Sequence, residues 1–269
     1  MVEPGESNHR EQTWVTGGAW RRRRLSESDL RERILGTAVA MLTESGGLTV
    51  SMAHLNMEEL IRIADVPRSS VYRAWGSKEA FYIELMERMV APGPEGSYAD
   101  DVVSIAHRVL DQNKQLLGTP QGRRAVLEEV VRSTVTQSFH GAARSLAWRS
   151  FTALAVAVPT LHDKDQQRIL AAMGASHAGI IDQITDLYAE LLMVVGMRMK
   201  AGFDLRTAIA TGSATMDGLI RLSFTDPATV ASRTLKPGLD GEPVEWELPP
   251  MAFMAILDAM IEPDPGFAE

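Results

Sequence analysis

Besides Trp75, which is expected to face inward, five side chains in the segment 67–75 can donate hydrogen bonds, and none of the five is acidic. They are Arg68, Ser69, Ser70, Tyr72 and Arg73. An arginine can pair bidentately with guanine in the major groove, which gives about 1–3 kcal/mol of discrimination between bases. Hydroxyl and phenol groups suit base edges and phosphate oxygens. Because an ordinary solvated helix mixes acids and bases, this acid-free face predicts contact with a polyanion.

Donors on either side of this face predict contacts with phosphate groups. Ser77 can cap a helix that begins at Lys78, so the free backbone amides and the Lys78 ammonium would hold a phosphate together. Asn56 and Tyr72 can donate to other phosphate oxygens. We therefore expect Asn56, Tyr72 and Lys78 to contact the duplex backbone. The residues expected to reach base edges or neighbouring phosphates are Arg68, Ser69, Ser70 and Arg73.

A helix–turn–helix would position these donors. Apolar residues in 57–64 recur with helical spacing and predict one buried stripe. Asn56 can cap this first helix, and Asp65 suits a turn in the left-handed region because its short polar side chain can bond locally. Pro67 suits the first turn of the second helix, in which Val71 would face inward.

An amphipathic helix should precede this pair and complete a three-helix core. Ser26 can cap it, and six apolar residues between positions 30 and 42 form one stripe. Segment 1–24, which we expect to be disordered, ends in four consecutive basic residues, Arg21, Arg22, Arg23 and Arg24. They would form an arm that tracks phosphates or enters the minor groove, or a solvated tail without a defined contact.

Segment 56–85 resembles the DNA-binding module of the tetracycline-repressor (TetR) family of bacterial regulators. The matching residues are Asn56, Leu60-Ile61, Ala64-Asp65-Val66, Tyr72 and Gly76-Ser77-Lys78-Glu79. The sequence departs from the family where Asp65 replaces a glycine, Pro67 a serine, and Ala74-Trp75 a His-Phe pair. The resemblance implies an all-α fold. A three-helix helix–turn–helix domain would occupy 25–90, and a larger helical domain for ligand binding and dimerisation would occupy 97–261.

The charge distribution restricts where nucleic acid could bind. The 269-residue chain has a net charge of −8, which taken alone argues against a nucleic-acid partner. Residues 20–90 carry 11 basic and 10 acidic side chains, whereas residues 91–269 carry 15 and 22. Attraction to DNA must therefore be local to one face. The chain has no cysteine, which excludes thiolate chemistry and is compatible with the cytoplasmic location that we expect.

Beyond a Pro- and Gly-rich breaker at 91–97 the pattern is helical throughout. We expect helices over 98–117, 121–139, 141–158, 163–200, 204–224 and 249–261, the fourth of them broken near Gly174 or Gly179. The most apolar run, 180–199, contains three acidic residues, so we expect no membrane partner. Segment 225–248 reads as a long loop, and neither it nor segment 48–55 suggests a function.

Aromatic and polar side chains are interleaved within 98–200, as in an apolar cavity with a few orienting groups. The candidates for binding a small-molecule effector are Phe139, His140, Arg144, Trp148, Phe151, His177 and Tyr188. The same residues could instead form an ordinary core. Neither interpretation identifies the effector.

The last two helices resemble the pair with which the family dimerises as a four-helix bundle. The candidates are Ile209, Met216, Leu219, Ile220, Phe253, Ile256, Leu257 and Met260. Alternatively, these residues pack only within the monomer. We expect a homodimer, because one short recognition helix reads too few base pairs, whereas two half-sites ~34–36 Å apart are selective.

The sequence carries no pattern typical of catalysis. None of the expected helices contains the Glu-x-x-His pair of carboxylate-bridged metal sites, and phosphate-loop and dinucleotide-binding patterns are missing. We expect no enzyme activity, no cofactor and no metal site. The resemblance implies a repressor that a small hydrophobic ligand releases from a double-stranded DNA operator. A ligand-independent regulator, an activator, and a helical enzyme with a vestigial DNA-binding module remain alternatives.

Overall fold

The computed structural model describes residues 25–44, 55–90 and 98–267. Within these ranges the all-α prediction is confirmed, with two short two-stranded sheets as the only strands. The predicted arm Arg21–Arg24, the disorder of 1–24 and most of segment 48–55 lie outside the described residues. None of the described helices is long and apolar enough to cross a membrane.

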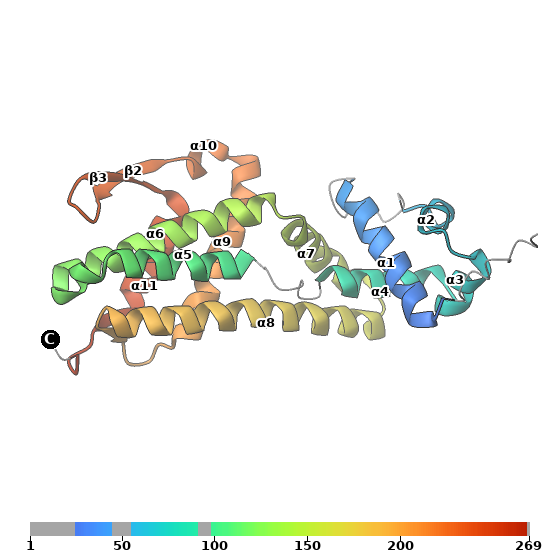
Figure 1. The fold of residues 1–269 in the computed structure, drawn as a ribbon, viewed down its shortest axis with the longest axis horizontal. Coiled ribbons are helices and arrows are strands. Elements are labelled where there is room, and N and C mark those ends of the chain that lie inside the picture. The colour runs from blue at the N-terminus through green and yellow to red at the C-terminus, as the bar shows by residue number, and fades with distance from the viewer. Residues whose placement is uncertain (1–24, 45–54, 91–97, 268–269) are drawn as a thin grey trace, which may run out of the picture.

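Four helices form one end of the elongated molecule (Figure 1). They are α1 (Glu27–Glu44), α2 (Met57–Ala64), α3 (Arg68–Trp75) and α4 (Lys78–Val90). Ser26 caps α1 as predicted, since its Oγ accepts the Asp29 amide at 3.1 Å. The apolar stripes of α1 and α2 meet in one core, where Ile34, Ala38 and Leu60 are fully buried.

Longer helices form the other end of the molecule. They are α5 (Tyr98–Gln112), the 3-10 helix η2 (Lys114–Gly118), α6 (Pro120–Arg144), α7 (Leu146–Ala157), η3 (Val158–Thr160), α8 (Asp163–Val194), α9 (Leu205–Thr225), α10 (Pro227–Val230) and α11 (Leu248–Met260). Their largest core joins α5, α6, α8, α9 and α11, with Leu127, Leu191 and Leu257 at its centre.

Helix α4 connects the two ends. Its Phe81 and Leu85 are buried in the core of α1–α3. Ile83, Met86 and Val90 pack instead against residues of α7, η3 and α8 in a second core. The Arg168 guanidinium on α8 also binds the Glu87 carboxylate on α4, with an N–O distance of 2.7 Å. Because one helix of 13 residues belongs to both cores, a shift of α4 would change the packing at both ends.

Two predicted helix boundaries were wrong. Helix α8 runs without a break through Gly174 and Gly179 and ends near Gly196, which has a φ of 66°. An isolated glycine costs a helix only about 1 kcal/mol relative to alanine, so packing can override it. Helix α6 likewise continues past Gly141, and the chain turns at Ser145, whose Oγ accepts the Trp148 amide at 3.3 Å and caps α7.

The Pro, Gly and Asp content of segment 225–248 predicted a long loop. The structure shows that this prediction was wrong. The segment contains α10 and an antiparallel hairpin of β2 (Arg233–Pro237) and β3 (Pro243–Glu247). Trp246 of β3 is buried in the main core, and the Lys236 ammonium lies 4.3 Å from its ring centroid. The second sheet pairs β1 (Met197–Met199) with β4 (Ile261–Pro263).

Helices α9 and α11 approach each other closely. A Cβ at Gly212 would lie 2.2 Å from the ring of Phe253, so glycine is required for this contact. Helix α9 begins at Asp204, whose carboxylate accepts the Thr207 amide at 2.8 Å and the Thr207 hydroxyl at 2.6 Å. These two bonds lower the pKa of Asp204 and keep it ionised as a cap.

Candidate nucleic-acid interface and internal cavity

The turn between α2 and α3 has the geometry that its residues predict. Asn56 caps α2, its Oδ1 accepting the Glu58 amide at 2.9 Å. Asp65 has φ 49° and ψ 53°, in the left-handed region. The Val66 amide then donates to the Ile61 carbonyl at 3.4 Å, which closes the end of α2. Helix α3 begins one residue later than predicted, with Pro67 in the cap position.

Helix α3 presents its donors outward. Val71 and Trp75 face the core, with exposed fractions of 1% and 8%. Ser70 is half-buried, whereas the remaining four predicted contact residues are exposed: Arg68, Ser69, Tyr72 and Arg73. Arg73 has no ion-pair partner among the residues that the structure describes, so its guanidinium is available to a ligand.

A polar network that the sequence did not predict anchors α3 from behind. The Trp75 indole Nε1 donates to Glu84 Oε2 of α4 at 2.7 Å. The Arg31 guanidinium of α1 donates to the same carboxylate and to the Ala74 carbonyl. It also lies 4.9 Å from the centroid of the Trp75 ring, close enough for a cation–π contact. The tryptophan that replaces the family's phenylalanine thus ties α3 to α1 and α4.

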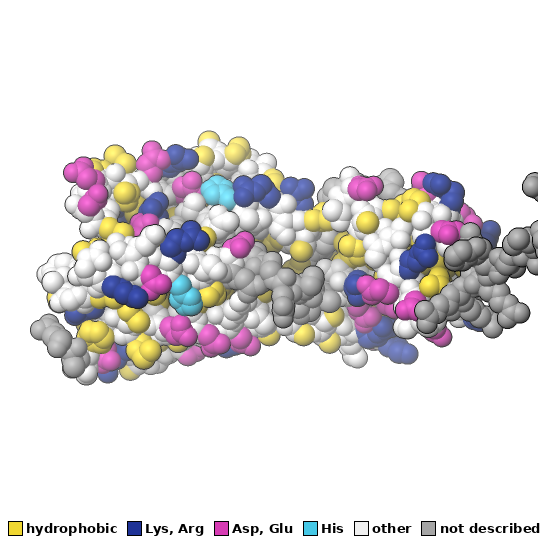
Figure 2. Space-filling model, in the orientation of Figure 1, with side chains coloured by type: hydrophobic (Ala, Val, Ile, Leu, Met, Phe, Trp, Pro, Cys, Tyr) yellow, Lys and Arg dark blue, Asp and Glu magenta, His cyan; other side chains and the backbone are white. Residues whose placement is uncertain are grey.

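The exposed face is not acid-free once the chain is folded. Glu58, at the start of α2, binds the Arg68 guanidinium with an N–O distance of 2.8 Å. The Tyr72 hydroxyl donates to the same carboxylate at 3.4 Å. The expectation from α3 alone was therefore incomplete, because spacing along one helix says nothing about a carboxylate that the preceding helix brings beside it. Figure 2 shows acidic and basic side chains interspersed over the α1–α4 end.

The predicted phosphate-binding corner lies at the start of α4. Ser77 Oγ accepts the Ala80 amide at 3.1 Å and caps the helix. Lys78 is exposed, with its Nζ 5.3 Å from the ring centroid of Tyr82. A hydrogen bond with Tyr82 raises the pKa of Lys78, which keeps the ammonium charged.

A cavity of about 690 Å³, open on part of its surface, lies between the C-terminal helices and the end of α4. Trp148, Phe151, His177 and Tyr188 line it, as predicted for the ligand site. The other three predicted residues do not. Phe139 is buried in a cluster with Ile220 and Val230 and is not itself part of the lining. His140 pairs with Glu247, with an N–O distance of 2.9 Å, and Arg144 at the end of α6 also lies outside the lining.

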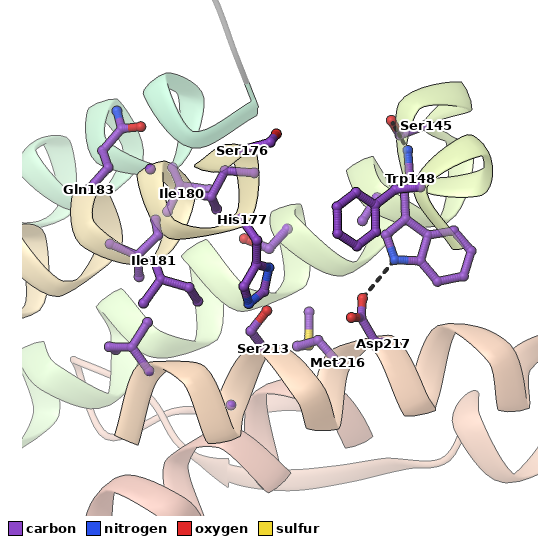
Figure 3. Close-up of a pocket in the computed structure, with 18 of the residues that line it drawn as sticks. Ser145, Trp148, Ser176, His177, Ile180, Ile181, Gln183, Ser213, Met216 and Asp217 are labelled. Atoms are coloured by element: carbon purple, nitrogen blue, oxygen red, sulfur yellow. Dashed lines mark hydrogen bonds between the residues drawn. The ribbon is translucent and has the colours of Figure 1, made fainter. Parts of the chain in front are cut away.

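Helix α9 supplies cavity residues that the sequence did not single out. Asp217 accepts the Trp148 indole N–H at 2.7 Å. His177 of α8 points toward Ser213 of α9 across the cavity, and its ring stacks on Phe151 at a centroid distance of 6.3 Å (Figure 3). Helical periodicity places Ser213 and Asp217 on one face, but which face meets the cavity depends on how α8 and α9 pack.

Several residues predicted to form a dimer interface lie inside this chain instead. Ile209, Ile220, Phe253 and Leu257 are 6% exposed or less. The first three also line the cavity together with Met216. Leu219, Ile256 and Met260 are half-buried. The period of each helix was read correctly, but the buried part of its apolar stripe packs within this chain.

Part of the chain is similar in sequence to a known transcriptional repressor. The HTH-type transcriptional repressor NemR of Escherichia coli (strain K12) is 29% identical over 97 residues, which cover 32% of this chain and 46% of NemR. The same protein of E. coli O6:H1 matches equally well, so the matched region spans less than half of these relatives. The match indicates similarity to an HTH-type transcriptional repressor over that region. No protein-family model matches the chain.

Two solved structures resemble most of the chain loosely. The crystal structure of E. coli NemR in its reduced form has a TM-score of 0.44 and 14% identity, and covers 87% of this chain and 98% of the NemR chain. A protein from Rhodococcus sp., described as a TetR-family transcriptional regulator, has a TM-score of 0.37 and 17% identity, and covers 85% of this chain and 97% of the Rhodococcus chain.

Among the described residues, no group of three or more His, Asp or Glu could hold a metal ion.

Proposed function

We propose that this chain is a TetR-type transcriptional regulator that binds double-stranded DNA through α3. The observation that supports this most is the orientation of α3, whose donors are exposed while Val71 and Trp75 fix its inner face. A helix held in this way can enter the major groove with its side chains at base edges. NemR, named as an HTH-type repressor, is consistent with this role.

Residue roles follow from position on the helix–turn–helix. Arg68, Ser69, Ser70 and Arg73 would reach base edges or adjacent phosphates from the exposed face of α3. Tyr72 and Lys78 would contact the duplex backbone, as would Asn56 at the cap of α2. The four-arginine arm at 21–24 would add contacts to phosphates or the minor groove.

We assign a different function to each end of the molecule. Residues 25–90 would form the DNA-binding domain, and residues 97–261 the domain that binds an effector and a second copy of the chain. A homodimer places two α3 helices in successive grooves. Since the apolar stripes of α9 and α11 are largely buried within the chain, their outer faces would supply the contact, including half-buried Leu219, Ile256 and Met260.

Helix α4 would couple ligand binding in the cavity to DNA binding by α3. Met89 and Val90 at its end line the cavity, while Phe81 and Leu85 belong to the core that holds α3. A small ligand in the cavity would shift α4 and change the distance between the two recognition helices. Coupling of about 1–3 kcal/mol between effector and operator is typical of such systems. We infer a repressor that its effector releases from DNA.

Selecting bound duplexes from a random pool tests this function. We expect enriched sites to be inverted repeats with half-site centres about one helical turn apart, because a twofold dimer reads two matching half-sites. Enrichment of a single half-site would contradict the dimer. A pool that stays random after repeated rounds would contradict sequence-specific binding itself.

A further inference from the structure

The charge of the cavity lining restricts which ligand it can hold. We propose that the cavity binds an organic cation with an aromatic or branched apolar body, held at Asp217. This inference names the chemical class of the effector and so rests on the proposed function. Asp217 is the only carboxylate that lines the cavity, and no lysine or arginine lines it among the described residues.

Asp217 has no cationic partner among the residues that the structure describes. Its only hydrogen bond there is the one it accepts from Trp148 Nε1, at 2.7 Å. The other carboxylate oxygen has no donor among the described residues. Arg221, one turn further along α9, is exposed and does not line the cavity. A carboxylate beside an apolar cavity without a counter-ion is costly to desolvate, and a bound cation would offset that cost.

Aromatic rings surround the same space. Trp148 of α7 bonds to Asp217, and Phe151 of α7 stacks on His177. Tyr188 and Phe253 line the cavity from α8 and α11. The faces of such rings attract ammonium and other organic cations, most strongly where water is excluded. One carboxylate with several rings is therefore a complementary site for a cation with an apolar body.

The lining fits other ligand classes less well. An anionic ligand would meet Asp217 with no guanidinium or ammonium to balance it. A neutral apolar ligand would fill the space but would leave the Asp217 carboxylate desolvated and unpaired. Ser213 and Ser176 also line the cavity, and their hydroxyls can orient a ligand but do not supply positive charge.

Two probes of equal shape and opposite charge test the proposal directly. Tetraphenylphosphonium and tetraphenylborate have the same four phenyl groups, and calorimetric titration of the full chain without DNA measures the affinity for each. We expect the phosphonium to bind at least tenfold more tightly than the borate. A slimmer pair, benzyltrimethylammonium and benzylsulfonate, should show the same order and removes any dependence on the bulk of the probe.

Asp217→Asn isolates the charge, because the amide oxygen can still accept the Trp148 N–H. This variant should lose at least tenfold in phosphonium affinity. Asp182→Asn is the matched control and should bind as the wild type does, since Asp182 is exposed, pairs with Arg206 and does not line the cavity.

Two outcomes would overturn the proposal. One is that neither cation binds more tightly than its anionic counterpart. The other is that Asp217→Asn binds the cation as tightly as the wild type. Neither outcome affects the duplex selection, which is carried out without a ligand, so failure of this inference is distinct from failure of the proposed function.

Discussion

Glu58 is the residue whose position changes the expected DNA interface most. Its carboxylate holds the Arg68 guanidinium at 2.8 Å, and the Arg68 guanidinium carbon also lies 5.4 Å from the Tyr72 ring centroid. Exposed ion pairs contribute only about 0–1 kcal/mol, so a phosphate or base can replace Glu58 as the partner of Arg68. A carboxylate this close to a duplex would repel its phosphates.

Glu58→Gln should therefore raise the affinity for duplex DNA by a few-fold at low salt. The gain should shrink as salt screens the charge, and the salt dependence of binding should steepen by about one counterion. Fluorescence anisotropy over a range of salt concentrations measures both. Glu245→Gln is the control, because Glu245 forms a comparable exposed pair with Arg233 at 2.5 Å on the hairpin. Weaker binding by Glu58→Gln would show instead that Glu58 orients Arg68 or reads a base.

At the scale of single elements, α3 depends on the network behind it. A helix of eight residues is too short to be stable alone, so tertiary contacts must hold it. Val71 packs into the core, and Trp75 bonds to Glu84 while Arg31 covers its ring. These contacts fix the direction in which the donors point.

Trp75→Phe, which restores the family residue, should lower the free energy of unfolding by about 1–2 kcal/mol, since a bond to a charged group and some packing are lost. Urea denaturation measures the change. Tyr82→Phe, which removes a 3.4 Å bond to the Leu55 carbonyl and the hydrogen bond with exposed Lys78, should cost less. Equal stability of Trp75→Phe and the wild type would mean that the network does not hold α3.

The helix–turn–helix was predictable because its signals are local. The Asn56 cap and the left-handed Asp65 each depend on neighbours within a few residues. The hairpin of β2 and β3 was missed because only Val244 and Trp246 alternate inward in a short strand, while Pro, Gly and Asp dominate the composition around it. Glycines 174 and 179 suggested a break that the packing of α8 overrides.

The functional residues also divide into those that local sequence predicts and those that depend on tertiary packing. Outward donors on α3 follow from one helix, whereas Glu58 and Asp217 act on partners from other elements. Which apolar stripe faces a cavity and which faces a partner depends on helices far apart in the sequence. This is why Ile209 and Phe253 were expected at a dimer interface but line the cavity.

For the molecule as a whole, α4 joins the end that carries α3 to the end that holds the cavity. Its residues belong both to the core beneath α3 and to the wall of the cavity. Binding at one end can thus change the position of α3 at the other, and by linkage DNA would change the affinity for the effector by the same factor.

Arg73→Ala tests most directly whether the exposed face of α3 contacts DNA. Its guanidinium is exposed and has no ion-pair partner among the described residues, so its removal disturbs little within the protein. Arg206→Ala removes the same charge from α9, well away from α3 along the long axis (Figure 1). On a duplex selected by the wild type, we expect Arg73→Ala to bind at least tenfold more weakly and Arg206→Ala to bind as the wild type does. Equal affinity of the two variants for that duplex would contradict the assignment of α3 as the recognition helix.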